Sequence, residues 1–151
     1  MSSLRIEVSI EEQRMCLYEG DVRIRSYPIS TAEQGTGCEE GSHCTPLGGF
    51  QIYRKIGDGA PLGTIFKGRE PSGEWAIGDA SEEDLILTRI LWLDGLDDEN
   101  ANTRERYIYI HGTNQEGLIG RPVSHGCVRM RNDDVIDFFD QVDEGTPMRI
   151  V

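Results

Sequence analysis

The chain has 151 residues, 37% of them hydrophobic, and a net charge of −12. These values fit a single globular domain over residues 1–151, large enough to hold a core without a disulfide or a bound metal. No apolar run approaches the ~20 residues that cross a bilayer, and the acidic balance argues against nonspecific binding to nucleic acid or to an anionic membrane face.

Short segments with alternating apolar and polar residues predict a mainly β fold. Glu19-Gly20-Asp21 reads as a hairpin turn, and residues 97–105 read as an exposed loop. Turn signals rich in Gly and Pro separate the segments, which favours a β-sandwich or a partly closed barrel. In chain order, strands are predicted over residues 4–10, 15–18, 22–27, 50–56, 74–77, 85–92, 106–110 and 148–151.

One principal α-helix is predicted near the C-terminus. Its apolar residues recur at helical spacing, at Val135, Ile136, Phe138, Phe139 and Val142. Asn132 is expected to be the N-cap, Asp133 and Asp134 suit the positive end of the helix dipole, and Gly145 and Pro147 are expected to end the helix.

The residues with catalytic chemistry begin at the predicted strand 106–110. Alternation along that strand places Tyr107, Tyr109 and His111 on one face. Gly112 follows and is expected to break the strand, so that His111 is exposed at its end. Such a histidine can serve as the base for a nucleophile on a neighbouring strand.

The nucleophile is expected at Cys127, which closes the run Ser124-His125-Gly126-Cys127. Gly126 permits a tight turn that can aim backbone N–H groups at an oxyanion. If a strand continues through residues 127–131, then Cys127, Arg129 and Arg131 share a face. Two guanidinium groups would lower the thiol pKa and could pair with a substrate carboxylate.

The charge pattern agrees with an anionic substrate. Residues 104–131 hold five arginines and two acids, a charge of +3 that leaves −15 for the rest of the chain. A basic patch in an acidic protein predicts local attraction of a carboxylate-bearing ligand. From the residues alone, the sequence predicts a cysteine acyl-transfer site.

Other cysteine and aromatic residues carry weaker signals. Cys38, His43 and Cys44 lie in one Gly-rich loop, but their spacing is poor for zinc, so the loop is expected to line the substrate groove and no metal is predicted. Cys16 is expected to be buried in a hairpin strand, and Trp75 and Trp92 are expected in the core. Asp133 and Asp134 point apart on a helix, which argues against a paired-carboxylate site.

Three motifs resemble the L,D-transpeptidase (YkuD-type) catalytic domain family. They read His-Gly-Thr-Asn from His111, Ser-His-Gly-Cys-Val-Arg from Ser124, and Thr-Pro-Leu-Gly-Gly-Phe from Thr45, with Ser30-Thr31 upstream. The resemblance covers essentially the whole chain. It implies a mostly β fold, no cofactor, and a thiol that attacks peptidoglycan stem peptides at the L–D bond before the terminal D-Ala of a tetrapeptide.

The resemblance also implies a role for each matching residue. Cys127 corresponds to the nucleophile, and His111 to the base. Gly126, with Cys127, corresponds to the oxyanion N–H groups, and Arg129 to a substrate-binding residue. The remaining matches are residues expected to shape the pocket or to bind the substrate: Ser124, His125, Gly112, Tyr109 and Arg131.

The start of the chain bears on location and activity. Residues 1–7 show no secretory signal, and four cysteines form no disulfide framework, so a cytoplasmic location is expected, or a periplasmic one if a leader has been trimmed away. Family members without export signals resemble L,D-carboxypeptidases, in which water replaces the acceptor amine. We therefore expect hydrolysis of a tetrapeptide or muropeptide in cell-wall recycling. Cross-linking or D-amino-acid exchange, a noncatalytic muropeptide-binding module, and a thiol-redox or zinc protein stay open as alternatives.

Overall fold

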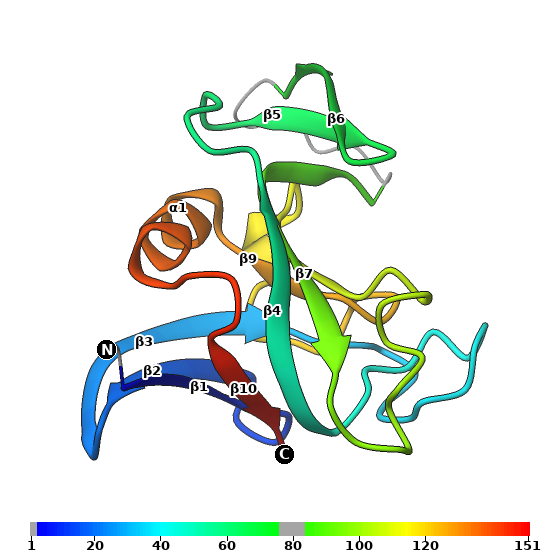
Figure 1. Cartoon of the computed structure of the whole chain (residues 1–151). Coiled ribbons are helices and arrows are strands. Elements are labelled where there is room, and N and C mark those ends of the chain that lie inside the picture. The colour runs from blue at the N-terminus through cyan, green and yellow to red at the C-terminus, as the bar shows by residue number, and fades with distance from the viewer. Residues whose placement is uncertain (1–2, 76–83) are drawn as a thin grey trace.

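The computed structural model describes residues 3–75 and 84–151 and is mainly β (Figure 1). Its elements are β1 (Leu4–Ser9), β2 (Arg14–Glu19), β3 (Val22–Ser30), β4 (Gly48–Ile56), β5 (Thr64–Lys67), β6 (Glu70–Glu74), β7 (Ile86–Gly95), β8 (Tyr109–Gly112), the 3-10 turn η1 (Glu116–Leu118), β9 (Val128–Met130), α1 (Asn132–Gln141) and β10 (Pro147–Ile150). In the described residues, no helix is long and apolar enough to cross a membrane.

The strands form one mixed sheet in the order β4-β10-β1-β2-β3-β9-β8-β7-β5-β6. The sheet curls until β4 also pairs with β7, which agrees with the partly closed arrangement predicted from the sequence. The hairpin of β5 and β6 projects beyond the rest (Figure 1). Inward-facing side chains of the curled sheet, including Ile6, Val8 and Ile110, meet the apolar side of α1 in the main core.

The predicted strands are mostly confirmed, and the exceptions have physical causes. The strand predicted over 106–110 is wrong, because β8 begins at Tyr109 and Gly112 is its last residue rather than its breaker. Tyr107 instead lies in a turn with φ of +56° and a 52% exposed side chain. Strand β5 and most of β6 are absent from the sequence prediction. Of the strand predicted over 74–77, only Glu74 is confirmed, as the last residue of β6, Trp75 is not in a strand, and residues 76–77 lie outside the described residues.

The predicted helix exists, but its boundaries differ. Arg131 is the N-cap and makes no side-chain capping bond, whereas Asn132 is the first helical residue and is buried. The helix ends at Gln141, well before Gly145 and Pro147. Asn132 does not cap because its side chain bonds to groups in neighbouring segments, which compete with the local capping geometry.

Three predictions of burial also need correction. The segment 97–105 is not simply exposed, because Asn100 and Thr103 are fully buried and the Asn100 amide donates to the carbonyls of Leu47 and Gly49. Cys16 is half-buried rather than buried. Trp92 is half-buried against a small second core that contains Phe66 and Tyr109.

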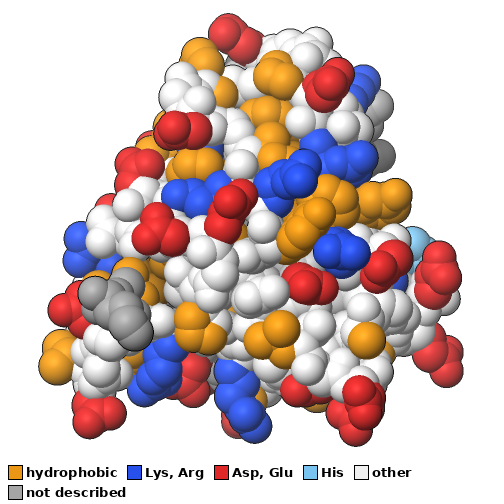
Figure 2. Space-filling view, viewed as in Figure 1, with side chains coloured by type: hydrophobic (Ala, Val, Ile, Leu, Met, Phe, Trp, Pro, Cys, Tyr) orange, Lys and Arg blue, Asp and Glu red, His pale blue; other side chains and the backbone are white. Residues whose placement is uncertain are grey.

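The surface charge is unevenly distributed. On the face viewed in Figure 2, acidic side chains are scattered widely, and a band of Lys and Arg side chains crosses the middle among hydrophobic ones. Several guanidinium groups stack on aromatic rings, with Arg69 over Trp92 and Tyr107, and Arg104 over Tyr53. Basic residues therefore gather locally in a chain whose net charge is −12.

Candidate active site

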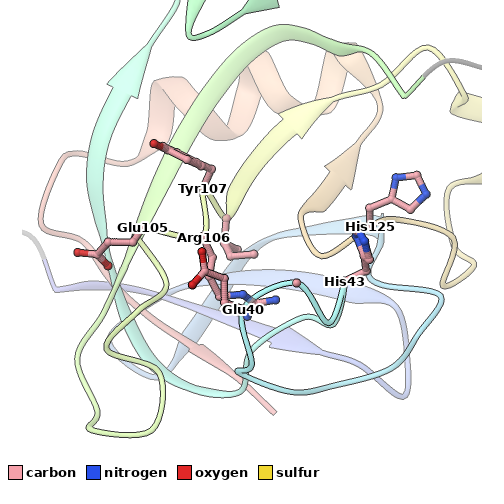
Figure 3. A pocket seen from close by; sticks show the side chains of 8 residues that line it. Glu40, His43, Glu105, Arg106, Tyr107 and His125 are labelled. Carbon is pink, nitrogen blue, oxygen red and sulfur yellow. The ribbon is translucent and has the colours of Figure 1, made fainter.

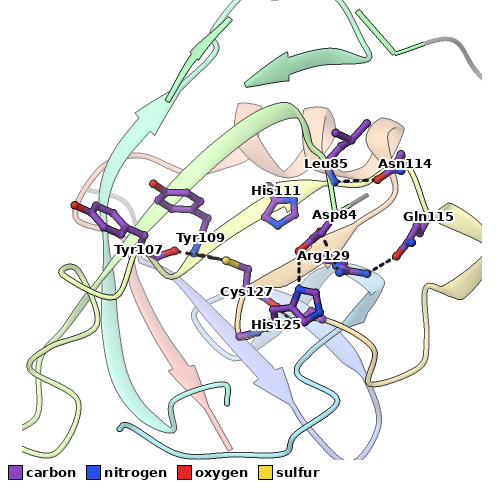
Figure 4. Close-up of polar contacts among 12 residues, drawn as sticks. Asp84, Leu85, Tyr107, Tyr109, His111, Asn114, Gln115, His125, Cys127 and Arg129 are labelled. Carbon is purple, nitrogen blue, oxygen red and sulfur yellow. Dashed lines mark hydrogen bonds and ion pairs between the residues drawn. The ribbon is translucent and has the colours of Figure 1, made fainter. Parts of the chain in front are cut away.

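Two parallel strands bring the predicted catalytic residues together. β8 pairs with β9 so that Ile110 is opposite Val128 and His111 is opposite Arg129. The apolar Ile110 and Val128 point into the core. Because side chains alternate along a strand, His111 and Arg129 project to the opposite face, where Figure 4 also shows Cys127.

Backbone groups hold the Cys127 thiol. The Tyr109 N–H donates to Sγ at 3.3 Å, and the thiol donates to the Tyr107 carbonyl at 3.5 Å. Burial raises the pKa of Cys127 to about 11, and this outweighs the Tyr109 N–H and the guanidinium groups of Arg129 and Arg106, which lower it. The predicted effect of a guanidinium on the thiol pKa is confirmed in direction for Arg129, but desolvation disfavours the thiolate more strongly, so the net shift is upward.

This environment predicts that the Cys127 thiol of the free protein reacts slowly with alkylating reagents. We expect iodoacetamide to alkylate Cys127 more slowly at pH 7 than it alkylates Cys38, with a Cys127 rate that rises toward an apparent pKa of about 11. Peptide mapping by mass spectrometry measures each cysteine separately, and Cys38, in the same protein, serves as the comparison. A Cys127 rate that reaches its plateau below pH 8 would contradict the prediction.

His111 is placed to act as a neutral base. Its Nδ1 lies 2.7 Å from the Gly112 carbonyl, an acceptor, so Nδ1 carries the hydrogen and Nε2 keeps its lone pair. The side chain is 1% exposed, so the exposure predicted from the sequence is wrong, because β8 continues through Gly112 and is buried along its length. Burial lowers the His111 pKa from the ordinary value of 6.5. His111 is therefore neutral at pH 7, the state that can accept a proton from the Cys127 thiol.

The turn before Cys127 is fixed by its neighbours. Ser124 donates its hydroxyl to the Cys127 carbonyl at 2.6 Å and accepts from the Gly126 N–H at 3.2 Å, so that N–H is already engaged within the turn. Gly126 has φ of +126°, and a Cβ there would lie 3.3 Å from the Cys44 carbonyl oxygen. The Thr45 hydroxyl donates to the Gly126 carbonyl at 3.0 Å, so the segment that begins with Thr45-Pro46 helps to fix the turn.

Beside the thiol lies a network of charged groups (Figure 4). The Arg129 side chain is 2% exposed, and its Nη2 contacts Asp84 Oδ1 at 3.0 Å. The other Asp84 oxygen lies 3.2 Å from His125 Nδ1, and His125 is 61% exposed. Arg129 Nη1 donates to Gln115 Oε1 at 2.8 Å. Asp84 thus bridges Arg129, which the sequence predicts to bind the substrate, and His125, which it predicts to shape the pocket.

The remaining predicted residues take other positions. Tyr109 is buried and its hydroxyl accepts from Arg69 at 3.1 Å, while its backbone N–H donates to the thiol and Cys127 packs against the small core that contains its ring. Arg131 is exposed at the N-cap of α1, because β9 ends at Met130, and the shared face expected for Cys127, Arg129 and Arg131 is wrong at its last member. Gly112 supplies the carbonyl that orients His111.

A pocket of about 320 Å³ opens beside Tyr107, whose carbonyl accepts from the thiol, although Cys127 itself does not line it (Figure 3). Its lining residues are Glu40, Gly41, His43, Glu105, Arg106, Tyr107, Ile108 and His125. The ring centroids of His43 and His125 are 5.8 Å apart. The loop of Cys38, His43 and Cys44 therefore contributes to the pocket wall, and in the described residues no cluster of three metal-ligating side chains occurs.

Asp84 is the residue that sequence reasoning missed. It lies just before β7, far in sequence from the motifs of β8 and β9, and no local pattern marks it among the chain's 27 acidic residues. The excess positive charge of residues 104–131 indicates that some acidic residue could pair with them, but it does not indicate which one. Asp84 lies near Arg129 and His125 because β7, which it precedes, pairs with β8.

Comparison with known proteins gives a consistent result. The L,D-transpeptidase catalytic domain family (YkuD) matches residues 3–150. The YkuD protein of Bacillus subtilis is 51% identical over 146 residues, which is 96% of this chain and 64% of that protein. The YkuD protein of Bacillus licheniformis is 29% identical over 147 residues, 97% of this chain and 64% of that protein. The chain thus spans 64% of the length of both relatives.

Solved structures share the fold. An L,D-transpeptidase from Mycobacterium smegmatis has a TM-score of 0.63 at 17% identity, over 99% of this chain and 59% of that one. L,D-transpeptidase 3 from Mycobacterium tuberculosis, in complex with a faropenem-derived adduct, also has a TM-score of 0.63, at 16% identity over 99% of this chain and 60% of that one. With the family match over nearly its whole length, the chain belongs to the YkuD family of L,D-transpeptidase catalytic domains.

Proposed function

We propose that this chain is a cysteine acyl-transfer enzyme that removes the terminal D-Ala from peptidoglycan tetrapeptides, with water as the acyl acceptor. The observation that carries the proposal is the β8–β9 pairing, which places a thiol, a neutral histidine and a buried arginine on one face. Family membership supports peptidoglycan stem peptides as the substrate class.

The geometry suggests a sequence of proton transfers. As Cys127 Sγ attacks the carbonyl carbon before D-Ala, His111 Nε2 takes the thiol proton, so a pKa of about 11 is no obstacle to attack. The tetrahedral intermediate expels D-Ala, whose amine takes that proton from His111. Water then attacks the thioester, gives a proton to His111, and the proton returns to Sγ as the tripeptide carboxylate leaves.

Recognition of a terminal carboxylate supports this choice of bond. A tetrapeptide ends in the carboxylate of D-Ala, and a guanidinium beside the thiol is the group that binds carboxylates most specifically. We also propose that the enzyme acts in the cytoplasm on wall-turnover fragments, a location with which its four free cysteines are compatible. Immunodetection of the chain in the periplasmic fraction of its host would contradict that location.

Mass spectrometry provides the direct test of the activity. The protein is incubated with a tetrapeptide muropeptide ending in D-Ala, beside a Cys127→Ala variant. We expect the loss of one D-Ala and a transient thioester adduct on Cys127, both missing from the variant. Unchanged substrate in both samples would contradict the hydrolase and leave a muropeptide-binding module, which a binding measurement with the same peptide would detect.

A second candidate is transfer to an amine. Glu40 and Glu105 both line the pocket beside the thiol, and their negative charges suit a cationic amine better than they suit water. Adding a D-amino acid or a second stem peptide to the incubation distinguishes the two. Exchange or cross-linked products in place of tripeptide would favour the transpeptidase.

A further inference from the structure

Arg129 cannot contact a substrate in the arrangement that the structure shows. Its side chain is 2% exposed, its Nη2 is held by Asp84 at 3.0 Å, and its Nη1 by Gln115 at 2.8 Å. Its Nε is buried and has no hydrogen-bond partner within the described part of the chain. A buried guanidinium with an unused donor is costly unless a further acceptor joins it. The arrangement therefore fits a site that a second carboxylate can enter.

Asp84 is the carboxylate that occupies this site in the structure, and the second carboxylate would be that of a bound peptide. The two Asp84 oxygens contact different cationic partners, Arg129 at 3.0 Å and His125 at 3.2 Å, as the carboxylate of a bound peptide would. The Asp84 side chain is 31% exposed, so rotation toward solvent is open to it, whereas Arg129 is enclosed. Asp84, and not Arg129, is therefore the residue whose side chain can move out of the anion site.

We propose that Asp84 is an internal competitor for the substrate carboxylate, a specificity-determining residue that occupies the anion site of Arg129 and His125 until a peptide carboxylate displaces it. The proposal deepens the proposed function and rests on it for the identity of the peptide. A ligand without a carboxylate cannot replace the contacts that Asp84 makes with Arg129 and His125. The competition therefore favours substrates that carry a carboxylate.

The charge of Asp84 also reaches the thiol. The Asp84 carboxylate acts to raise the pKa of Cys127, while the Arg129 guanidinium acts to lower it. Figure 4 shows Cys127 beside Arg129, His125 and Asp84, so a small anionic reagent at the thiol meets the same anion site. Iodoacetate and iodoacetamide, which differ in whether they carry a carboxylate, can report on the site without any peptide substrate.

The test uses Asp84→Asn, with Asp21→Asn as a control that makes the same charge change in an exposed turn. We expect the ratio of iodoacetate to iodoacetamide alkylation at Cys127 to rise about three- to tenfold in Asp84→Asn and to stay unchanged in the control, because removing the competitor increases the fraction of open sites. The increase should disappear in Asp84→Asn combined with Arg129→Gln. An unchanged or lower ratio in Asp84→Asn would overturn the proposal.

Tetrapeptide kinetics supply a second readout. Asp84→Asn should lower KM by a similar factor with little change in kcat. If Asp84 instead served to position Arg129, the same variant would raise KM and lower the alkylation ratio, which would overturn the proposal. The alkylation ratio needs no turnover, so it tests the role of Asp84 even if the tetrapeptide is not a substrate. A failure of the proposed function can therefore be distinguished from a failure of the proposal for Asp84.

Discussion

Replacing His111 with Asn should lower the rate of Cys127 acylation by about 10²–10⁴-fold, the usual contribution of a positioned general base. At pH 7 the thiol is protonated, because burial raises its pKa to about 11, so attack requires a group that accepts its proton. An Asn side chain can keep the hydrogen bond to the Gly112 carbonyl that His111 makes at 2.7 Å, but it has no basic nitrogen. Single-turnover formation of the thioester, followed by mass spectrometry, measures the effect.

The matched control is His43→Asn. His43 lines the pocket together with His125, is exposed, and has φ of +59°, a conformation that Asn tolerates well. We expect its acylation rate to stay within a few-fold of the unmodified protein. Equal losses in both variants would show that the pocket, and not the base, limits the reaction.

The pH profile gives an independent check on His111. Burial lowers its pKa from 6.5, so the neutral form persists below that pH in the folded protein. The acylation rate should therefore stay level as the pH falls to 6.5 and decline only below it, through protonation of His111. A decline that begins above pH 7 would mean that His111 is easier to protonate than its burial implies.

Replacing Asn132 with Ala should destabilise the fold by about 2–4 kcal/mol, because it leaves several buried polar groups without partners. Asn132 is 1% exposed, accepts from the Thr88 hydroxyl at 2.6 Å, and donates to the Thr113 carbonyl at 2.9 Å and to Glu116 at 3.1 Å. Alanine provides none of these bonds. In a chain of this size the change corresponds to a fall in Tm of about 5–15 °C, measurable by circular dichroism.

Asp133→Ala is the control for Asn132→Ala. It is the next residue of α1, exposed in the first turn, where an acid contributes only about 0.3–1 kcal/mol through the helix dipole. We expect its Tm to change by less than half as much. Similar Tm values for the two variants would contradict the role assigned to the Asn132 network.

The Asn132 network also connects stability to the site. A Cβ at Gly112 would lie 2.3 Å from Asn132 Oδ1 and 2.7 Å from the Leu87 carbonyl, so β8 passes this point in close contact with α1 and β7. Gly112 supplies the carbonyl that orients His111. The sequence predicts only a local capping role for Asn132, because local patterns cannot show a contact across three elements.

What the sequence determined by itself are the features encoded by local pattern. Alternation between apolar and polar residues marked most of the strands, and helical spacing marked the core of α1. The motifs around His111 and Cys127 identified the family, since residue types at fixed spacing are visible without a structure. The chemistry of a thiol beside a histidine also follows from residue type.

Other features of the site depend on contacts between segments that are distant in the sequence. The pKa of Cys127 is set by burial, which the neighbouring arginines in the sequence do not reveal. The strand at Tyr109 starts later than its alternation suggests, because Tyr107 turns away with a positive φ to place its carbonyl against the thiol. Asp84 joins the site only because β7 pairs with β8. Desolvation and long-range pairing arise when the chain folds, and for that reason no local pattern could predict them.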